Sequence, residues 1–564
     1  MPINRRSFLM QTMATLGAAA TAGGDSSLTA PRPARAAQTP AQAAKPNILL
    51  ILVDDMGYSD LGCFGAEIAT PNLDRLAAGG LRMSGMYNCA RCCPSRASLL
   101  TGLYPHQAGI GHMVQNRGHR SYQGYLRDDC VTLAEVLRPA GYYTGYCGKW
   151  HTGGDWPRSD HDAAQWRFDD PTHPMPTRRG FERFYGNPAG GGSYFNIHLV
   201  EQEQVIQLPE SFYTTDHYTS KAIEFMGEAK AQGRPFFVHL CYNAPHWPLH
   251  ALPQDIAKYR GKYRKGWDAV RTARHEQLKG MGILDKRWDI SPRDAQAPPW
   301  QDAGRQEWED ARMAVYAAMV DRVDQNVGHV LDHLEKTGQL DNTLILFVSD
   351  NGGCAEQVRQ GVGKAQISVT RDGQPMRFGN DPALEPGGAD TFMSYDLPWA
   401  NASNSPFRRF KHWVHEGGIA TPLIAHWPKA IGSGAIRHEA AHFIDITATI
   451  YDVAGAAYPA EYQGRHVQPL EGQSFAPLLR GAAWQRQQAI FWEHEGNRAV
   501  RDGDMKLVSR HPGQWELYDM QADRTELHDL ADRYPDKVAA LGKRYDQWAT
   551  RCGVIEWAEL SKRK

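Results

Sequence analysis

Residues 47–53 read NILLILV, and this apolar run ends abruptly in DDMG at residues 54–57. A second run of the same design, TLILFVS at residues 343–349, ends in DNGG at residues 350–353. Short, continuous apolar runs that stop at acids and glycine are typical of buried strands in a parallel sheet. We therefore expect two such strands, with polar side chains at their carboxyl ends, where open α/β sheets bind ligands.

Strand-like and helix-like patterns alternate around these two runs. Helices are predicted near residues 72–79, 131–140, 216–231 and 308–334, and further strands near 142–147 and 235–242. This alternation predicts an α/β sandwich with a mainly parallel central sheet. Residues 259–308 are charged and carry Trp and Pro without strong periodicity. We expect them to run over the surface or the rim of a site, where the Trp side chains either stack on substrate rings or simply pack.

The pattern changes after about residue 480. Short alternating runs at 489–492, 498–501, 505–508 and 515–518, followed by a helical stretch at 534–550, predict a small antiparallel sheet packed with a helix. The chain has 564 residues, well above the roughly 100–200 of a single domain. We therefore divide it into a leader and linker (1–44), a large N-terminal catalytic domain (45–480) and a small C-terminal α+β subdomain (481–564).

Composition excludes several classes of protein. Lys+Arg number 62 and Asp+Glu 63, a net charge of −1, so no general attraction to nucleic acid or anionic membranes is expected. Nine cysteines in a chain of this length do not form a disulfide scaffold, and an odd number leaves at least one thiol unpaired. Cys89 and Cys92 have a zinc-ligand spacing, but the second pair that a structural site needs is missing nearby, so zinc is not expected there.

The N-terminus predicts export. NRRSFLM at residues 4–10 is a twin-arginine pattern, an apolar, Ala-rich stretch follows to about residue 23, and Ala34-Arg35-Ala36 suits cleavage. The stretch is too short and too rich in small residues for stable membrane insertion. We expect the twin-arginine machinery to export the folded protein, making it periplasmic or secreted in a bacterium. The alternative is a disordered basic tail.

The acids at the two strand ends predict a metal site. Asp54, Asp55, Asp350 and Asn351 would place three carboxylates and one amide oxygen at the same edge of the sheet. Oxygen ligands of this kind suit a hard cation, Ca²⁺ or Mg²⁺, better than zinc. Strand-end acids also cap helices, but two pairs of matching form favour the metal.

The stretch CCPSRASLLTG at residues 92–102 predicts a reactive position. Pro94 suits the first turn of a helix, which places Cys92 at the positive N-terminal end, where free amides and the dipole favour an anion. Arg96, about one turn further on, is expected to face the same point and to clamp an oxyanion bidentately. The alternative is a buried or low-pKa thiol without a function.

The motif C-x-P-S-R followed by A-S-L-L-T-G resembles the signature of type I sulfatases, which belong to the alkaline-phosphatase-like superfamily. Matching segments run from about Pro46 to beyond Leu479. The resemblance implies that a maturase oxidises Cys92 to Cα-formylglycine, whose hydrate is both the nucleophile and a metal ligand. Cys93 then occupies the variable position of the motif. The resemblance also favours Ca²⁺ over Mg²⁺.

Other segments match the same family. GKWH at residues 148–151 resembles the segment that places Lys149 on the sulfate and His151 near the formylglycine hydroxyl. APH at residues 244–246 implies that His246 lies on the leaving-group side, and RRFK at 408–411 implies a second sulfate-binding lysine, Lys411. GFERFYG at 180–186 resembles a family landmark with no catalytic role that we would assign. The implied reaction is hydrolysis of an aryl sulfate or a sulfated carbohydrate.

Other functions are open from the sequence. The nearest is a phosphate or phosphonate monoester hydrolase of the same superfamily, and one from another class is a non-catalytic protein that binds sulfated glycans. A two-zinc nucleotide pyrophosphatase would need more Asp and His ligands, and no G-x-S-x-G motif of a serine hydrolase occurs. Segments 104–112 and 491–497 resemble chains described as arylsulfatases, which leaves the substrate alcohol undecided.

Overall fold

A large mixed sheet forms the centre of the computed structural model, which describes residues 45–157, 162–360 and 367–563. Its four central strands, in the order β8-β1-β7-β3, are all parallel, and antiparallel pairs occur only toward the two edges of this sheet. The predicted α/β sandwich with a mainly parallel sheet is therefore confirmed. In spatial order the strands are β12 (Ala435–Arg437), β2 (Leu81–Tyr87), β11 (Ala420–His426), β8 (Thr343–Ser349), β1 (Asn47–Val53), β7 (Phe236–Cys241), β3 (Tyr143–Lys149), β4 (Arg183–Asn187), β5 (Leu199–Glu201) and β6 (Gln204–Ile206), with β13 (Ala441–His442) paired to β2.

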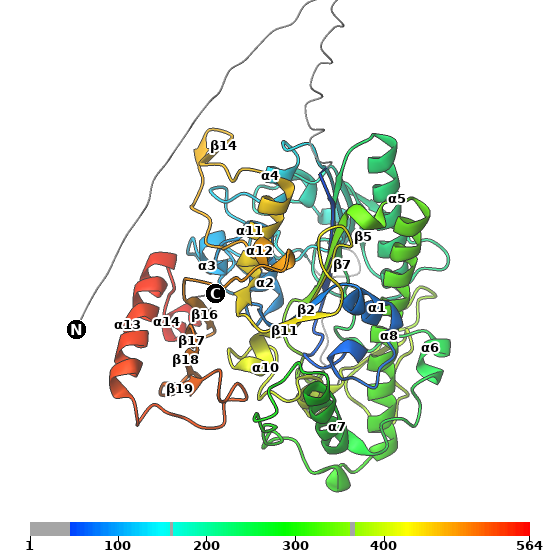
Figure 1. The fold of residues 1–564 in the computed structure, drawn as a ribbon. Coiled ribbons are helices and arrows are strands. Elements are labelled where there is room, and N and C mark those ends of the chain that lie inside the picture. The colour runs from blue at the N-terminus through cyan, green and yellow to red at the C-terminus, as the bar shows by residue number, and fades with distance from the viewer. Residues whose placement is uncertain (1–44, 158–161, 361–366, 564) are drawn as a thin grey trace, which may run out of the picture. The chain divides into compact units, whose positions relative to one another are not determined.

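The sheet is covered on both faces, since every residue of its central strands is buried and most of these residues are apolar. Leu49 and Ile51 of β1 pack into one hydrophobic core, and Leu50 and Leu52 pack into the other. Successive strand side chains point to opposite faces, so a continuous apolar run serves two layers of helices. Figure 1 shows these layers on either side of the sheet. The first core is covered by α1 (Pro71–Ala78), α5 (Thr214–Ala231) and α8 (Gln306–Lys336), and the second by α2 (Cys92–Thr101), α4 (Leu133–Leu137) and α11 (Phe443–Ala454).

The expectation of an aperiodic surface excursion over residues 259–308 is wrong in part. It contains α7 (Gly266–Gly280), which packs on α9 (Asp396–Ser403). Trp267 is buried, its ring centroid lies 4.8 Å from that of Trp300, and both rings contact Trp399. These Trp side chains pack against one another, so they are not stacking platforms for a ligand. The shorter helices are α3 (Pro105–Ala108), α6 (Pro253–Ala257), α10 (Glu416–Ile419), α12 (Ala476–Leu479) and α14 (Trp557–Leu560).

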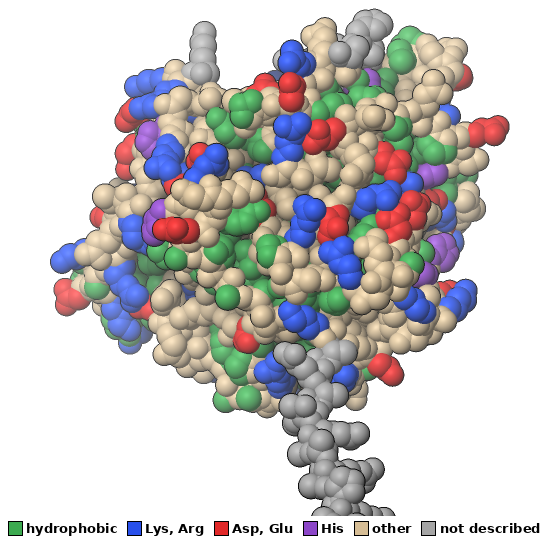
Figure 2. Space-filling view, turned by 90° about the horizontal axis from the view of Figure 1, so that it is seen from above, with side chains coloured by type: hydrophobic (Ala, Val, Ile, Leu, Met, Phe, Trp, Pro, Cys, Tyr) green, Lys and Arg blue, Asp and Glu red, His purple; other side chains and the backbone are tan. Residues whose placement is uncertain are grey.

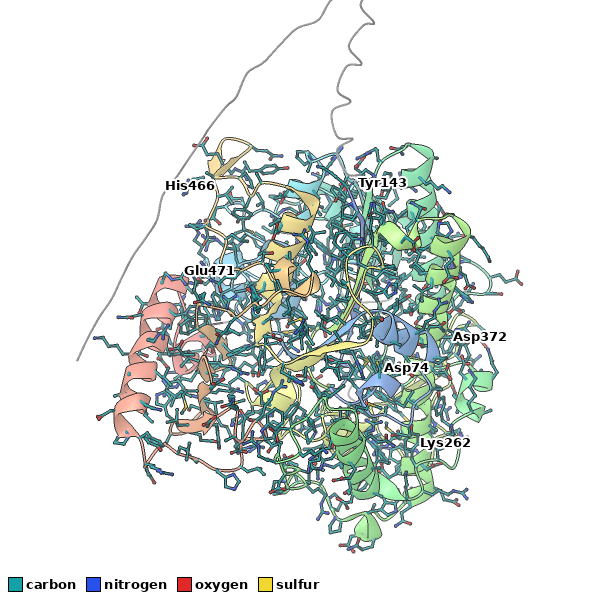
Figure 3. All side chains as sticks on the ribbon, viewed as in Figure 1. Asp74, Tyr143, Lys262, Asp372, His466 and Glu471 are labelled. Carbon is teal, nitrogen blue, oxygen red and sulfur yellow. The ribbon has the colours of Figure 1, made fainter. Side chains whose placement is uncertain are left out.

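The C-terminal region forms the small antiparallel sheet that the sequence predicts. Its strands are β16 (Ile490–His494), β17 (Asn497–Asp502), β18 (Met505–Ser509) and β19 (Glu516–Asp519), paired in chain order. Helix α13 (Pro535–Cys552) packs on this sheet through Leu541, Tyr545 and Trp548. Glu471, labelled in Figure 3, lies beside this helix and pairs with Arg551. The domain boundary near residue 480 stays a prediction, since residues 45–564 form one compact unit.

The surface carries interspersed charges of both signs. Figure 2 shows blue and red side chains mixed over the face in view, as a net charge of −1 suggests. All nine cysteines, which fall in the described ranges, are buried and free. Within those ranges no helix is both long and apolar enough to cross a bilayer. The predicted twin-arginine leader lies outside the described residues.

Candidate active site

The central strands bring the predicted site residues to one edge of the sheet. Val53 of β1 is in register with Ser349 of β8, so the acids that follow these two strands emerge side by side. On the other side of β1 lie β7 and then β3. β3 ends at Lys149, and His246 follows shortly after the end of β7. Sites in such sheets lie beyond the carboxyl ends of the strands, and the chain follows this rule.

Buried oxygens without hydrogen bonds mark the acidic end as a place for a cation. Asp54 Oδ1, Asp55 Oδ2 and Asn351 Oδ1 are buried and have no hydrogen-bond partner among the described residues. The other carboxylate oxygens are engaged, since Lys149 Nζ pairs with Asp54 Oδ2, and Lys411 Nζ lies 2.7 Å from Asp55 Oδ1. Leaving buried acceptors unsatisfied is costly, and a hard cation with oxygen ligands removes that cost. The residues present therefore fit the Ca²⁺ or Mg²⁺ that the sequence predicts.

The electrostatics of the two buried acids point the same way. Burial, followed by the negative charge of Asp54, raises the pKa of Asp350 well above its usual range. Burial also acts to raise the pKa of Asp54, but Lys149, His246 and Arg96 outweigh it and hold that pKa below its usual range. Carboxylates that share a buried site ionise together only when enough positive charge is near. A divalent cation would supply that charge.

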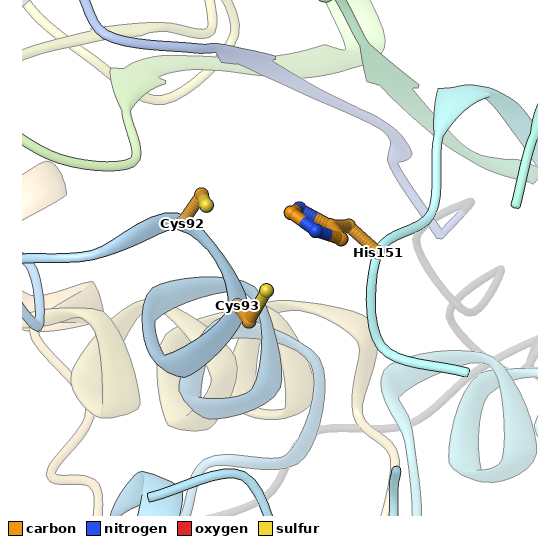
Figure 4. A group of neighbouring side chains, drawn as sticks. All are labelled: Cys92, Cys93 and His151. Carbon is orange, nitrogen blue, oxygen red and sulfur yellow. The ribbon is translucent and has the colours of Figure 1, made fainter. Parts of the chain in front are cut away.

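Cys92 is the first residue of α2, a helix whose ten residues are all buried. A hydrogen bond with Cys93 and the positive charges of Lys149, His151 and Lys411 outweigh burial and hold the pKa of the Cys92 thiol well below its usual value. Figure 4 shows Cys92 and Cys93 at the start of the helix, facing the ring of His151. One potential ligand atom from each of these three residues lies within 4.8 Å of the others. The helix N-terminus thus favours negative charge at position 92.

The three neighbouring cysteines do not form one cluster. Cys89 Sγ lies 3.3 Å from Ser98 Oγ and 3.5 Å from His442 Nε2, and burial raises the pKa of its thiol to about 12. Cys92 and Cys93 instead face His151. The three thiols are therefore not placed to bind one zinc ion together.

A cavity of about 280 Å³ opens over Cys92, and its lining includes Lys149, His151, His246 and Lys411. His246 Nε2 lies 3.4 Å from Asp55 Oδ2, which connects the cavity to the acidic end of the sheet. Both lysines are almost completely buried, and the pKa of each is raised because the charges of nearby acids outweigh burial. The cavity thus combines two fixed positive charges with two imidazoles over one thiol. Such a site suits an anionic ester.

Arg96 does not take the place that the sequence predicts. Its Nε lies 2.9 Å and its Nη2 2.8 Å from Asp350 Oδ2, while Nη1 donates to the Lys149 carbonyl oxygen at 2.8 Å. The guanidinium is 1% exposed and does not line the cavity. The expected bidentate clamp on a substrate oxyanion is therefore replaced by a clamp on Asp350. Arg96 positions this carboxylate and compensates its charge.

Two residues of the cavity wall were missed from the sequence. Arg91 Nη1 lies 2.6 Å from Glu356 Oε1, and both side chains line the cavity. Burial raises the pKa of Glu356, but the charges of Arg91 and then Lys411 outweigh it and lower that pKa. Neither residue stands in a recognisable motif. The only signal is proximity, because Arg91 directly precedes Cys92 and Glu356 follows Asp350 by one short loop.

Comparison with known proteins decides the family. A sequence profile of the sulfatase family matches residues 46–456, which is well over half of the chain. The chain belongs to the sulfatase family. A second profile, that of the C-terminal region of N-sulphoglucosamine sulphohydrolase, matches residues 407–547 of this sulfatase. Membership makes the protein a sulfuric ester hydrolase, and the predicted family and reaction class are confirmed.

Similar proteins match more than three quarters of this sulfatase. An uncharacterized sulfatase of Schizosaccharomyces pombe is 32% identical over 550 residues, 91% of this chain and 95% of the relative. An arylsulfatase of Klebsiella aerogenes is 31% identical over 466 residues, 78% of this chain and 93% of the relative. The crystal structure of Ps i-CgsB in complex with k-i-k-neocarrahexaose has 26% identity and a TM-score of 0.63, and the match covers 90% of this chain and 93% of that one. The similar proteins thus include one described as an arylsulfatase and one whose structure holds a carbohydrate.

Proposed function

We propose that this sulfatase hydrolyses the sulfate monoester of an aryl alcohol or a carbohydrate in the cavity over residue 92. The observation that carries the proposal is the convergence of Cys92, two lysines and two histidines on one cavity beside buried, unsatisfied carboxylate oxygens. Fixed positive charges at a water-poor site stabilise the negative charge that develops on a transferring sulfate. The same arrangement leaves one oxygen of Asp54 and one of Asp55 without a hydrogen bond among the described residues, and these oxygens are available to a cation.

The nucleophile is proposed to be formylglycine made from Cys92 by a maturase of the host. Its support is the position of Cys92 at the start of a buried helix, where negative charge is favoured, next to His151. Hydrated formylglycine supplies a geminal diol, so the sulfate can leave by elimination. A serine at this position would form a stable ester that water must attack.

Asp54, Asp55, Asp350 and Asn351, together with residue 92, are proposed to hold one divalent cation, with Ca²⁺ favoured over Mg²⁺. The orphaned oxygens of Asp54, Asp55 and Asn351 support this assignment. All-oxygen donor sets suit hard cations. When bound, the cation supplies further positive charge to the sulfate oxygens and to the nucleophile.

The side chains of the chain itself are proposed to divide the remaining work. Lys149 and Lys411 neutralise the non-bridging oxygens of the sulfate, while Asp350, held by Arg96, receives the proton of the attacking hydroxyl. His246 or Lys411 gives a proton to the oxygen of the departing alcohol. His151 then takes the proton of the second hydroxyl of residue 92, which allows the sulfate to leave.

The size of the cavity supports a small substrate. About 280 Å³ is near the lower limit of small-molecule sites, so the cavity suits a sulfate group with part of one ring and not a long internal segment of a polymer. An aryl sulfate or a terminal sulfated sugar meets this condition. The Klebsiella arylsulfatase supports an aryl sulfate, and the complex of Ps i-CgsB with k-i-k-neocarrahexaose supports a carbohydrate in general.

Residues 1–44 are proposed to direct export through the twin-arginine machinery to the periplasm or the exterior of a bacterium. The twin arginines Arg5 and Arg6 and the Ala-rich stretch behind them support this proposal. Because that machinery transports folded proteins, oxidation of Cys92 and binding of the cation would both take place in the cytoplasm.

The test combines turnover with mass spectrometry of residue 92. Trypsin releases this residue in the peptide CCPSR, residues 92–96, whose mass reports conversion to formylglycine. We expect the modified peptide, and we expect a higher kcat/KM on aryl sulfates or sulfated sugars than on matched phosphates and phosphonates. An unmodified thiol in a host that makes formylglycine would contradict the proposed nucleophile. Faster phosphate or phosphonate cleavage would contradict the proposed substrate class, and a lack of any turnover would favour a glycan-binding role.

A further inference from the structure

A second cluster of metal-binding side chains lies behind the cavity wall. His412, which follows Lys411, meets His494 at the end of β16 and Glu495 in the turn before β17, and one ligand atom of each lies within 4.8 Å of the others. His412 Nδ1 lies 3.3 Å from Glu495 Oε2. His494 Nε2 lies 3.7 Å from Glu495 Oε1. None of these residues belongs to the proposed catalytic set.

His494 gives the strongest sign that this cluster binds an ion. Its side chain is completely buried, yet within the described part of the chain neither ring nitrogen has a hydrogen-bond partner. An imidazole buried in this way pays the full cost of leaving its polar atoms unsatisfied. The 3.7 Å between Nε2 and Glu495 Oε1 is too long for a hydrogen bond but suits two atoms that bind one ion. Ligand atoms about 2.0–2.1 Å from a tetrahedral zinc ion stand about 3.3 Å apart.

The neighbours of the cluster hold the donors in the orientation that an ion needs. His112 Nε2 lies 2.8 Å from Glu495 Oε1, and the ring of His112 stacks on that of His494 with centroids 5.6 Å apart. Asn497 Nδ2 lies 3.4 Å from His412 Nε2, which is a weak contact; binding of an ion through Nδ1 moves the ring proton to Nε2 and gives this contact up. Groups that hydrogen-bond to metal ligands fix their orientation in this way. The side chains of His412 and Glu495 are 28% and 25% exposed, which leaves a path for the ion to enter.

We propose that His412, His494 and Glu495 bind one Zn²⁺ ion, or a similar transition metal, with a water as the fourth ligand. Two imidazoles and one carboxylate are typical zinc ligands, whereas Ca²⁺ and Mg²⁺ prefer oxygen donors alone. The ion ties the turn between β16 and β17 to the segment that carries Lys411. It therefore acts as a structural link between the C-terminal sheet and the wall of the active-site cavity, and it is separate from the cation proposed at Asp54 and Asp350.

The experiment measures metal content, so its result does not depend on the proposed function. Untagged protein is equilibrated with Zn²⁺ in the presence of saturating Ca²⁺, passed through gel filtration and analysed by inductively coupled plasma mass spectrometry. Wild type is expected to retain one equivalent of zinc more than His494→Phe and Glu495→Gln. His528→Phe is the matched control, because His528 lies in the same C-terminal region with a 75% exposed side chain. It is expected to retain as much zinc as wild type.

Two results would overturn the proposal. Wild type that retains no zinc would do so whether or not the variants fold, and equal retention by wild type and Glu495→Gln would do so as well. The partly exposed Glu495 makes this variant the safer of the two if His494→Phe is unstable. Crystals soaked in Zn²⁺ give an independent readout, since an anomalous peak between His412, His494 and Glu495 is expected at the zinc edge. A peak only at other positions would contradict the site.

Discussion

Cys92 differs from the other thiols in the sign of its electrostatic environment. A hydrogen bond with Cys93 and the charges of positive side chains lower its pKa, whereas burial raises the pKa of Cys89 to about 12. We expect Cys92→Ser, in a host without a serine-type maturase, to fold, to bind the cation and to lose at least about 10⁴-fold in kcat on an aryl sulfate, since the nucleophile is missing. Cys89→Ser is the matched control and should stay active. Full activity of Cys92→Ser would exclude formylglycine as the nucleophile.

The proton donor to the departing alcohol is also a property of one residue. His246 lies at the cavity beside Asp55, and its proposed role is tested by His246→Gln. General acid catalysis contributes about 10²–10⁴-fold, and it matters most for a poor leaving group. We therefore expect a loss of this size on an alkyl or sugar sulfate and a much smaller loss on an activated aryl sulfate. Equal losses on both substrates would mean that His246 is not the proton donor. Lys411 would then have this role, and Lys411→Met would show the larger loss on the alkyl or sugar sulfate.

The parts of the site that could be predicted are those whose positions follow from local sequence patterns. Asp54 and Asp350 follow strands that lie side by side, so their positions depend only on local patterns. The sequence correctly predicts the position of Arg96 on its helix. It cannot predict the contact of Arg96, because the partner Asp350 is 254 residues away in the sequence. Arg91 and Glu356 were missed for the same reason. A long-range ion pair leaves no local pattern.

At the level of elements, apolar strands were easier to predict than polar helices. β1 and β8 are apolar at nearly every position. An apolar run of this length is best interpreted as a buried strand. Helix α7 was missed because its buried face contains Arg271, Arg274 and His275 next to its apolar residues. Arg274 is satisfied by an ion pair of 2.6 Å with Asp60. Charged residues that pair with partners far away in the sequence therefore interrupt the apolar periodicity by which a helix packed on a core is normally recognised.

Strand β18 attaches the C-terminal sheet to the catalytic region through a buried charge. Lys506 Nζ lies 2.8 Å from Glu416 Oε1 and 2.8 Å from Glu526 Oε1, and all three side chains are fully buried. Removing one member of such a network leaves unpaired buried charges, which costs about 3–5 kcal/mol. We expect Lys506→Met to lower the free energy of unfolding by this amount in urea titrations. Lys543→Met, at an exposed position of α13, should change it by less than about 0.5 kcal/mol. Equal stability of the two variants would contradict the role of this network.

For the whole molecule, the proposed cation is a source of stability as well as of activity. A ligand that binds only the folded state stabilises it by about 2.7 kcal/mol at a concentration of 100 Kd. Removal of calcium with a chelator is therefore expected to lower both Tm and kcat, and added Ca²⁺ should restore them. Asn351→Leu removes an oxygen that has no hydrogen-bond partner among the residues that the structure describes, so the Tm of this variant should respond much less to Ca²⁺. A chelated wild type with unchanged Tm and kcat would contradict the site.

Acid unfolding of the whole molecule should depend on Glu416. Burial raises the pKa of this carboxyl, but Lys506 and then Arg524 outweigh it and lower the pKa from about 4.5 to about 2. A pKa lowered in the folded state stabilises the protein above the ordinary pKa, and this stability is lost as the pH falls toward the folded value. The difference corresponds to on the order of 3 kcal/mol.

Wild type and Glu416→Gln should therefore differ most in free energy of unfolding at pH 5–7, and the difference should shrink steadily between about pH 4.5 and pH 2. Urea titrations at each pH, followed by near-ultraviolet circular dichroism, measure this difference. Glu335→Gln is the matched control, because Glu335 pairs with Arg75 at the surface, where the two side chains are 45% and 50% exposed. Its difference from wild type should be small at every pH. A difference for Glu416→Gln that stays constant down to pH 2 would mean that the pKa of Glu416 is not lowered, and that its stabilising effect comes from packing and hydrogen bonds that do not depend on its charge.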